Sequence, residues 1–382
     1  MDLSLIGIDD PRRSRQGIKL MDVCRGVAYS RIIVDTIVDN LWSDTNICAH
    51  GPATRCVMPR SYDLAHLAHV ELLTPRPEAS LDFFVQVMGL TVSAQHGDST
   101  YLRGWDDYEF HTLKLTAATT NGMRHFAFRA SSEESLRRRV QAVDAAGLGI
   151  GWVDDEVAHG PAYRYHTPDG HVGELYYETR WYEADQDTRP ALKNQAARFP
   201  ARGANLRRLD HLNLLASRVT PMREFYTNTL GCLLTEQIVF DDGSEKGAWF
   251  SVTNKSYDLA VSEDHSGARG RLHHMTYAVD SREDVLRAAD ICLEHGVQIE
   301  TGPHKHAVQQ TFFLYVYEPG GNRFEICSAG ARLILAPDWR TIVWTEAERR
   351  KGQAWGLQTV ASFHTHGTPS TTRATDGEEN DA

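Results

Sequence analysis

The sequence predicts an α+β fold in which one unit, strand–helix–strand–strand–strand, occurs at least twice. Two segments begin alike: HVELLTPRPEASLDFFVQVMGL from His69 and HLNLLASRVTPMREFYTNTLGC from His211. Each is followed by a histidine that leads into a further strand and helix, and each copy closes with a Pro-Gly turn and an acidic strand. Because these three features recur in the same order, residues 63–180 and 205–330 are interpreted as two copies of one unit.

Each element of the unit has its own signal. The first strand alternates apolar residues, and a turn with proline then leads into an amphipathic helix that ends at Gly89 or Gly231. RHFAFRASSEESLRRRVQAVDAAG and HHMTYAVDSREDVLRAADICLEHG each predict a strand followed by a helix. TPDGHVGELYYE and EPGGNRFEICSA each predict a tight turn and a closing strand.

The remaining segments lack this pattern. Residues 1–57 show no clean periodicity, whereas a well-patterned strand follows Met58, so the first domain is taken as 58–180. Residues 1–57 are interpreted either as a loose, disordered extension or as an upstream over-reading of the gene. Residues 181–204 are polar and suit a connector. Residues 331–370 are expected to form a C-terminal arm over the pocket, and 371–382 a disordered tail.

Composition narrows the function classes. The net charge of -11 argues against nucleic acid or an anionic membrane surface as the main partner. No run of roughly 18 apolar residues predicts a membrane span. Six scattered cysteines without a Cys-x-x-Cys pair favour a reducing compartment, so a cytoplasmic location is expected. The 18 histidines direct attention to metal and acid–base chemistry.

Three ligand-type residues fall at corresponding points of the second copy: His211 in its first strand, His274 in the next and Glu325 in the last. If the strands curl around one cavity, two imidazoles and one carboxylate meet there. This ligand set is typical of a non-haem Fe(II) oxygenase, and Mn(II) accepts the same ligands.

The first copy carries His69, His125 and Glu174 at the corresponding positions. Ligand types alone therefore allow a metal there as well. However, Asp155 and Arg164 stand where the second copy has His306 and Tyr315, so the acid–base partners of the second copy are missing.

His306 and Tyr315 precede Glu325 across a Pro-Gly-Gly hairpin. The hairpin allows the phenol and the carboxylate to face the same pocket. A histidine and a phenol beside a metal suit proton transfer to and from bound oxygen.

The stretch H-x7-LYVYEPGGNRFE, from His306 to Glu325, resembles the signature of class I extradiol dioxygenases, the catechol 2,3-dioxygenase (metapyrocatechase) group. LDHLNLL, GRLHHMTYAVDSREDVLRAADIC and AWGLQTVASFHTHGTP also resemble that group, so the resemblance covers about residues 63–370. It implies the vicinal oxygen chelate fold, with four βαβββ modules in two barrel-like domains. It also implies iron in the C-terminal domain, 205–330, and a metal-free N-terminal domain, 58–180.

Residue by residue, the resemblance implies that His211, His274 and Glu325 are the iron ligands. It implies that His306 hydrogen-bonds the reacting oxygen and that Tyr315 contacts a substrate oxygen. Of the adjacent pair His273–His274 the family pattern places the ligand second, and alternation along the strand predicts that His273 points away.

One position departs from the family, which usually has an acid–base histidine on the strand before His274. Tyr257 occupies that place here. A tyrosine, with a reference pKa near ~10, donates a proton but is a poor base at neutral pH. Tyr257 is therefore expected to hydrogen-bond the distal oxygen and to take protons only weakly, with His306 carrying more of the proton transfer or His265 swinging in.

The function that the resemblance implies is extradiol ring cleavage of catechol or a substituted catechol with O2, giving a 2-hydroxymuconic semialdehyde in aromatic catabolism. The cofactor would be Fe(II), or Mn(II), and the assembly a homotetramer. Two alternatives stay open within the same fold: a glyoxalase-type metal isomerase or lyase, and a metal-free small-molecule binding module.

Two further motifs lie in the C-terminal arm. Arg349–Lys351 is interpreted as a solvated charged face. His364 and His366 would suit a second metal site, but the preferred interpretation places them in the arm over the pocket mouth.

Overall fold

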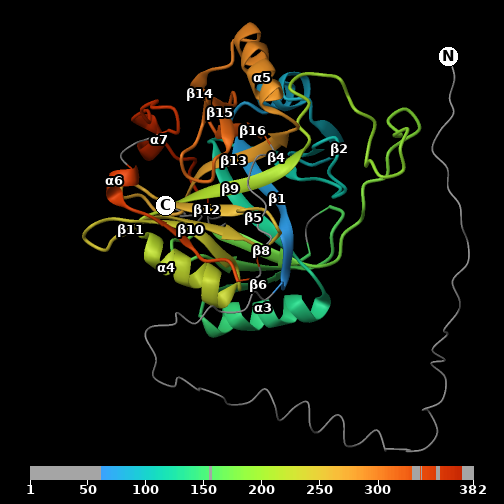
Figure 1. Ribbon diagram of the computed structural model, residues 1–382. Helices are drawn as coiled ribbons and strands as arrows, with labels where there is room; N and C mark the ends of the chain where they lie inside the picture. Colours follow the sequence, from blue (N-terminus) through green and yellow to red (C-terminus); the bar gives the residue numbers. More distant parts are fainter. Residues whose placement is uncertain (1–61, 155–156, 329–335, 337, 350–352, 372–382) are drawn as a thin grey trace, which may run out of the picture. The chain divides into compact units, whose positions relative to one another are not determined.

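The computed structural model describes residues 62–154, 157–328, 336, 338–349 and 353–371 (Figure 1). All of them belong to one compact unit. The expected extension 1–57 lies outside these residues, as do Asp155 and positions 372–382 of the expected tail. Among the described residues, no helix is both long and apolar enough to cross a membrane.

The N-terminal half forms an eight-stranded sheet in the order β2-β3-β4-β1-β5-β8-β7-β6. Its first module consists of β1 (Leu64–Thr74), α2 (Pro77–Asp82), the π-helical turn η1 (Phe83–Val87), β2 (Thr91–His96), β3 (Ser99–Arg103) and β4 (Leu113–Ala117). Its second consists of β5 (Gly122–Ala130), α3 (Glu133–Ala145), β6 (Gly149–Val153), β7 (Ala162–His166) and β8 (Val172–Tyr176).

The C-terminal half forms a nine-stranded sheet in the order β14-β15-β16-β13-β9-β12-β11-β10-β17. The third module consists of β9 (Arg208–Ala216), α4 (Val219–Glu224), η2 (Phe225–Thr229), β10 (Leu233–Val239), β11 (Glu245–Ser251) and β12 (Leu259–Glu263). The fourth consists of β13 (Arg271–Val279), α5 (Arg282–Glu294), β14 (Ile299–Lys305), β15 (Phe312–Tyr317) and β16 (Arg323–Ser328). The final segment adds β17 (Ile342–Trp344), α6 (Glu346–Arg349) and α7 (Ser362–Thr365).

The four modules share one topology. In each module the last strand pairs parallel with the first, and the two first strands of each half pair antiparallel. The expected α+β fold of paired βαβββ modules is therefore confirmed.

Local sequence explains where the helices begin and end. α3 and α5 start at the N-caps Ser132 and Ser281, whose side chains accept hydrogen bonds from backbone N–H groups of the first turn. The predicted helix ends Gly89 and Gly231 adopt positive φ values of 84° and 71°. These values lie in the left-handed region that glycine adopts without strain.

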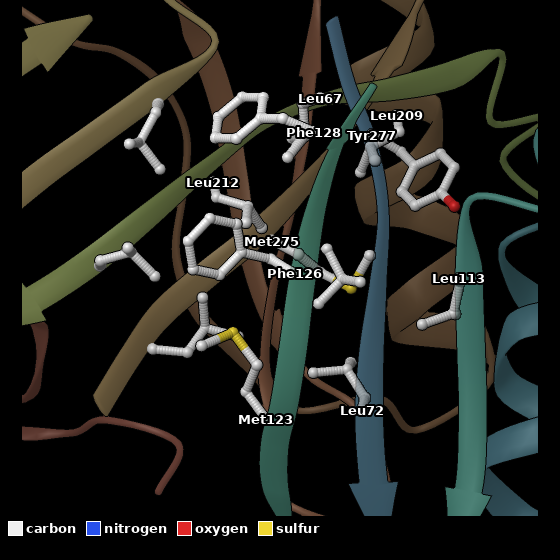
Figure 2. Packing of buried hydrophobic residues seen from close by; sticks show 14 of the residues in the cluster. Leu67, Leu72, Leu113, Met123, Phe126, Phe128, Leu209, Leu212, Met275 and Tyr277 are labelled. Atoms are coloured by element: carbon white, nitrogen blue, oxygen red, sulfur yellow. The ribbon is translucent and has the colours of Figure 1, made fainter. Parts of the chain in front are cut away.

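The apolar core lies between the two halves. Leu72 of β1 and Phe126 of β5 belong to the same buried cluster as Leu212 of β9 and Met275 of β13. Figure 2 shows these side chains from both halves packed together. Since neighbouring residues of a strand face opposite sides, their neighbours in sequence project from the other face of each sheet, where the polar clusters lie.

Two β-bulges interrupt the alternation of the β9–β13 pair. The register shifts between Leu272 and His274 on β13 and between Thr276 and Tyr277, so that His273 and Asp210 are extra residues in the pairing. The expectation that His273 points away from the pocket was wrong, because the first bulge turns it to the same side as His274.

Candidate metal centre

Three side chains from β9, β13 and β16 converge on one point. His211 Nε2 lies 3.0 Å from Glu325 Oε2, His274 Nε2 lies 3.1 Å from the same oxygen, and the two nitrogens are 3.4 Å apart. All three residues are at most 2% exposed. The sequence-predicted ligands therefore meet, with their ligand atoms within 4.8 Å of one another.

The Nδ1 atom of His211 points away from Glu325 and toward a second carboxylate. His211 Nδ1 lies 3.1 Å from Asp210 Oδ2. Burial alone would raise the pKa of Asp210, but the Lys255 ammonium and His211 lower it, so the carboxylate is charged and accepts. Nδ1 of His211 therefore donates to Asp210, and Nε2 faces Glu325 Oε2 and Thr276 Oγ1. Burial alone would lower the pKa of His211, but the Glu325 and Asp210 carboxylates raise it.

A second chain of hydrogen bonds keeps the proton of His274 on Nδ1. His273 Nε2 donates to the carbonyl of Phe363 at 2.6 Å, which leaves His273 Nδ1 to accept from His274 Nδ1 at 2.5 Å. Burial and the charge of Arg323 hold the pKa of His273 well below its ordinary value, so its ring is neutral. The lone pair of His274 Nε2 therefore also faces Glu325.

Two imidazole nitrogens and a carboxylate oxygen face one another here at about 3 Å, an arrangement that a proton on His211 or a bound cation can bridge. The donor set of two imidazoles and one carboxylate matches Fe(II) and Mn(II). The residues present thus fit the metal that the family pattern implies.

His306 and Tyr315 form a hydrogen-bonded pair beside the centre. His306 Nδ1 donates to Gln353 Oε1 at 2.9 Å, so its Nε2 accepts from the Tyr315 hydroxyl at 3.0 Å. His306 Nε2 lies 3.8 Å from Glu325 Oε1. Burial raises the pKa of Tyr315 well above its ordinary value, so the phenol keeps its proton at neutral pH.

Tyr257 also reaches the centre. Its hydroxyl lies 3.0 Å from Thr311 Oγ1 and 3.4 Å from His211 Nε2. Burial raises the pKa of Tyr257 well above its ordinary value, which suits a hydrogen-bond donor and not a base. The alternative residue, His265, is half exposed and stacks on His364 with ring centroids 4.7 Å apart.

These groups line a cavity of about 460 Å³. His211, His274, His306, Tyr315 and Tyr257 all contribute to its wall, and Glu325 lies buried behind them. Apolar side chains complete the wall, chiefly Ile238, Phe240, Trp249, Val308 and Phe363. A cavity of this size holds a single small aromatic ring with substituents.

The C-terminal arm contributes to the pocket in ways that its sequence did not indicate. Gln353 and Phe363 provide the acceptors that orient His306 and His273. Arg349 lines the pocket and donates to His364 Nε2 at 3.1 Å, so its interpretation as a solvated residue was wrong. Lys351 lies outside the described residues.

The two histidines of the arm, His364 and His366, do not form a metal site with other described residues. His364 lines the pocket, and His366 uses its carbonyl to accept from Arg323 at 2.9 Å. Within the described part of the chain, neither belongs to a cluster with metal-ligand spacing.

Comparison with known proteins agrees with this geometry. The family model of the Glyoxalase/Bleomycin resistance protein/Dioxygenase superfamily matches residues 66–175 and 208–326. The chain is 40% identical to a metapyrocatechase of Geobacillus stearothermophilus over 314 residues, 82% of this chain and 96% of that one. It is 36% identical to a manganese-dependent 2,3-dihydroxybiphenyl 1,2-dioxygenase of Geobacillus genomosp. 3, covering 77% and 94%.

A solved structure points to the same family. Homoprotocatechuate 2,3-dioxygenase of Brevibacterium fuscum, in its anaerobic complex with 3,4-dihydroxyphenylacetate, superimposes with a TM-score of 0.71 at 27% identity, covering 80% of this chain and 93% of that one. With sequence, fold and site in agreement, the chain belongs to the glyoxalase/bleomycin resistance protein/dioxygenase superfamily and, within it, to the metapyrocatechase group of extradiol ring-cleavage dioxygenases.

Proposed function

We propose that this protein opens the ring of catechol or a substituted catechol with O2, in the extradiol position, giving a 2-hydroxymuconic semialdehyde in the breakdown of aromatic compounds. The observation that carries the proposal is the meeting of two imidazole nitrogens with a carboxylate at the wall of a ring-sized cavity. The names of the relatives, metapyrocatechase and 2,3-dihydroxybiphenyl 1,2-dioxygenase, support it.

His211, His274 and Glu325 would hold the metal, Fe(II) or, as in the manganese-dependent relative, Mn(II). An ion held there would supply a Lewis acid for the catechol oxygens and a path for electrons from the ring to O2. We place this chemistry in residues 205–330.

The side chains around the centre would transfer protons and donate hydrogen bonds during the reaction. His306 Nε2 takes a proton from the substrate and returns it, because its Nδ1 is held by Gln353 and only Nε2 is available. Tyr257 keeps its own proton and would donate a hydrogen bond to a reacting oxygen. Tyr315 also keeps its proton and would donate it to a substrate oxygen once its hydroxyl turns away from His306 Nε2. The apolar wall formed by Trp249 and Phe240 would enclose the ring.

The His306–Tyr315 pair separates this function from its alternatives. A glyoxalase-type isomerase or lyase does not need this pair. A metal-free binding module leaves unexplained why two buried imidazoles and a buried carboxylate meet at one point with metal-ligand spacing.

A homotetramer and a cytoplasmic location are further proposals. The family resemblance supports the first. Buried thiols such as Cys292 and Cys327 support a reducing compartment. Light scattering on the purified full chain tests the oligomeric state.

Anaerobic loading with Fe(II), followed by catechol and air, tests the function. We expect uptake of one O2 per catechol and a yellow product, with the fastest rate among catechol, 3-methylcatechol, 4-methylcatechol and homoprotocatechuate identifying the substituent. Glu325→Gln should lose iron and activity by roughly 100-fold or more, since even partners of metal ligands are worth about 10–100-fold.

The exposed Glu78→Gln serves as the matched control and should behave as wild type. Iron-loaded wild type that consumes no O2 with any of the four catechols would contradict the function. Full iron content in Glu325→Gln would contradict the ligand assignment.

A further inference from the structure

The N-terminal half contains a second buried cluster at positions that correspond to the metal centre. His69 of β1, His125 of β5 and Glu174 of β8 occupy the places of His211, His274 and Glu325. His69 Nε2 lies 3.1 Å from His125 Nε2 and 3.8 Å from Glu174 Oε2, and His125 Nε2 lies 3.3 Å from that oxygen. None of the three is more than 1% exposed.

A fourth ring, His159, joins this cluster. Its Nδ1 donates to the carbonyl of Gly160 at 2.8 Å, so the lone pair of Nε2 is free to bind. That Nε2 is buried and makes no hydrogen bond to any described residue. The ligand atoms of His69, His159 and Glu174 all lie within 4.8 Å of one another.

Two buried atoms of the cluster, His159 Nε2 and Glu174 Oε2, make no hydrogen bond to any described residue. His125 Nδ1 lies 3.0 Å from Glu71 Oε2, and its Nε2 faces His69 and Glu174. Burial holds the pKa of His69 well below its ordinary value, so its ring is neutral. Buried acceptors that face one another without donors are strongly unfavourable, and a bound cation removes the conflict.

Arg164 does not replace that cation. It occupies the place of Tyr315 and its Nε lies 2.5 Å from Glu174 Oε1. The other oxygen, Oε2, faces the imidazoles and makes no hydrogen bond to a described residue. A carboxylate that binds a guanidinium through one oxygen and a metal through the other is an ordinary arrangement.

We propose that the N-terminal half binds a second metal ion, Zn²⁺, through His69, His125, His159 and Glu174. Three imidazoles and a carboxylate suit zinc, and four protein ligands close its tetrahedral shell, as in structural zinc sites. This assignment departs from the metal-free N-terminal domain that the family resemblance implies.

The second site is structural and not catalytic. The pocket described above is lined by residues of the C-terminal half and its arm, and the N-terminal ligands do not reach it. Arg164 stands in place of the phenol donor, and three of the four ligands, His69, His125 and Glu174, are buried. A metal bound only by the folded chain stabilises the fold.

Metal analysis of the full chain carrying Glu325→Gln tests the proposal, because this variant removes the catalytic site from the count. We expect one Zn²⁺ per chain in Glu325→Gln and none in the double variant Glu325→Gln/His159→Gln. In the wild type we expect two metals per chain, one of them Zn²⁺. Stripped protein titrated with Co²⁺ should show the intense visible bands of a tetrahedral site in Glu325→Gln.

The matched control is Glu325→Gln/His96→Gln, because His96 is an exposed histidine of the same half. This control should keep its Zn²⁺ and the thermal midpoint of Glu325→Gln, whereas chelation should lower that midpoint. A Glu325→Gln protein that binds no metal, or an unchanged Zn²⁺ content in Glu325→Gln/His159→Gln, overturns the proposal. Neither result would affect ring cleavage by the wild type, so the two proposals fail separately.

Discussion

At the residue scale, the chemistry of the centre depends on where each proton is held. His211 and His274 both keep their protons on Nδ1, and in each case the acceptor is the residue immediately before, Asp210 or His273. The geometry therefore presents both Nε2 atoms to one point beside Glu325. His306 also keeps its proton on Nδ1, but its acceptor, Gln353, lies far away in sequence.

Tyr257 offers a test at this scale. Replacing it with phenylalanine removes a donor 3.4 Å from His211 Nε2. We expect kcat for O2 uptake to fall by about 5–10-fold, the equivalent of one neutral hydrogen bond of about 1 kcal/mol. Tyr257→His should be at least as fast as wild type, because an imidazole exchanges protons near neutral pH.

Tyr226→Phe is the control for this experiment. Tyr226 is also fully buried, but it packs in the apolar core and not at the pocket. If Tyr257→Phe and Tyr257→His both turn over at the wild-type rate, Tyr257 has no part in the reaction.

At the scale of elements, the repeated units allowed the sequence to place the candidate ligands. His211, His274 and Glu325 could be found because each occupies a corresponding point of a repeated strand. His273 was misplaced because strict alternation along a strand cannot foresee a bulge. Asp210 could have been found from its position next to His211, a carboxylate beside a ligand imidazole.

For the C-terminal arm, the family resemblance indicated a place over the pocket but not the roles of its individual side chains. Gln353, Phe363 and Arg349 act on the pocket only because the chain folds back over it, and nothing in their local sequence encodes that path. Segments that lack periodicity are placed by tertiary contacts, which a pattern in the sequence does not reveal.

Gln353 tests the role of the arm as an element. Gln353→Leu removes the acceptor of His306 Nδ1, so the proton can move to Nε2 and the ring loses its orientation. We expect kcat to fall by roughly tenfold, at the low end for a partner of an active-site group. Gln353→Glu restores an acceptor and should recover most of the loss.

Gln353→Leu and Gln353→Glu together distinguish an effect on the orientation of His306 from an effect on the stability of the fold. Both should keep the thermal midpoint of the wild type to within a few degrees, since the contact is only partly buried. Equal loss of activity in Gln353→Leu and Gln353→Glu would show that the acceptor is not what matters.

At the scale of the whole molecule, the two halves share one core. Leu72 and Phe126 pack in the same cluster as Leu212 and Met275, so neither sheet buries its apolar face alone (Figure 2). The repetition in the sequence predicted two copies of one unit, 63–180 and 205–330, and the family resemblance implied the four modules. The sequence could not predict that the two sheets share a core, because apolar positions on a strand do not say which sheet they will meet.

Leu212→Ala tests the shared core. The substitution should lower the free energy of unfolding by about 2–5 kcal/mol, through lost burial and the cavity that remains. Calorimetry should still show one transition, shifted as a whole, since both halves lose the same packing. Leu286→Ala, at a side chain that is 51% exposed, should change stability by less than about 0.5 kcal/mol.

Two separate transitions, with only one of them moved by Leu212→Ala, would contradict a common core. The stability of each half would then have to be measured on its own.

The bulges at Asp210 and His273 have a consequence for thermal motion. Each ligand imidazole is held by a side chain one peptide bond away, so the two partners are carried by the same stretch of backbone. When the sheet fluctuates, each imidazole ring and its hydrogen-bond partner move together. The direction of the Nε2 atom is therefore kept during motions that would separate partners on different strands. Because each imidazole and its partner are neighbours in the chain, motion of the sheet changes the orientation of the Nε2 atom little.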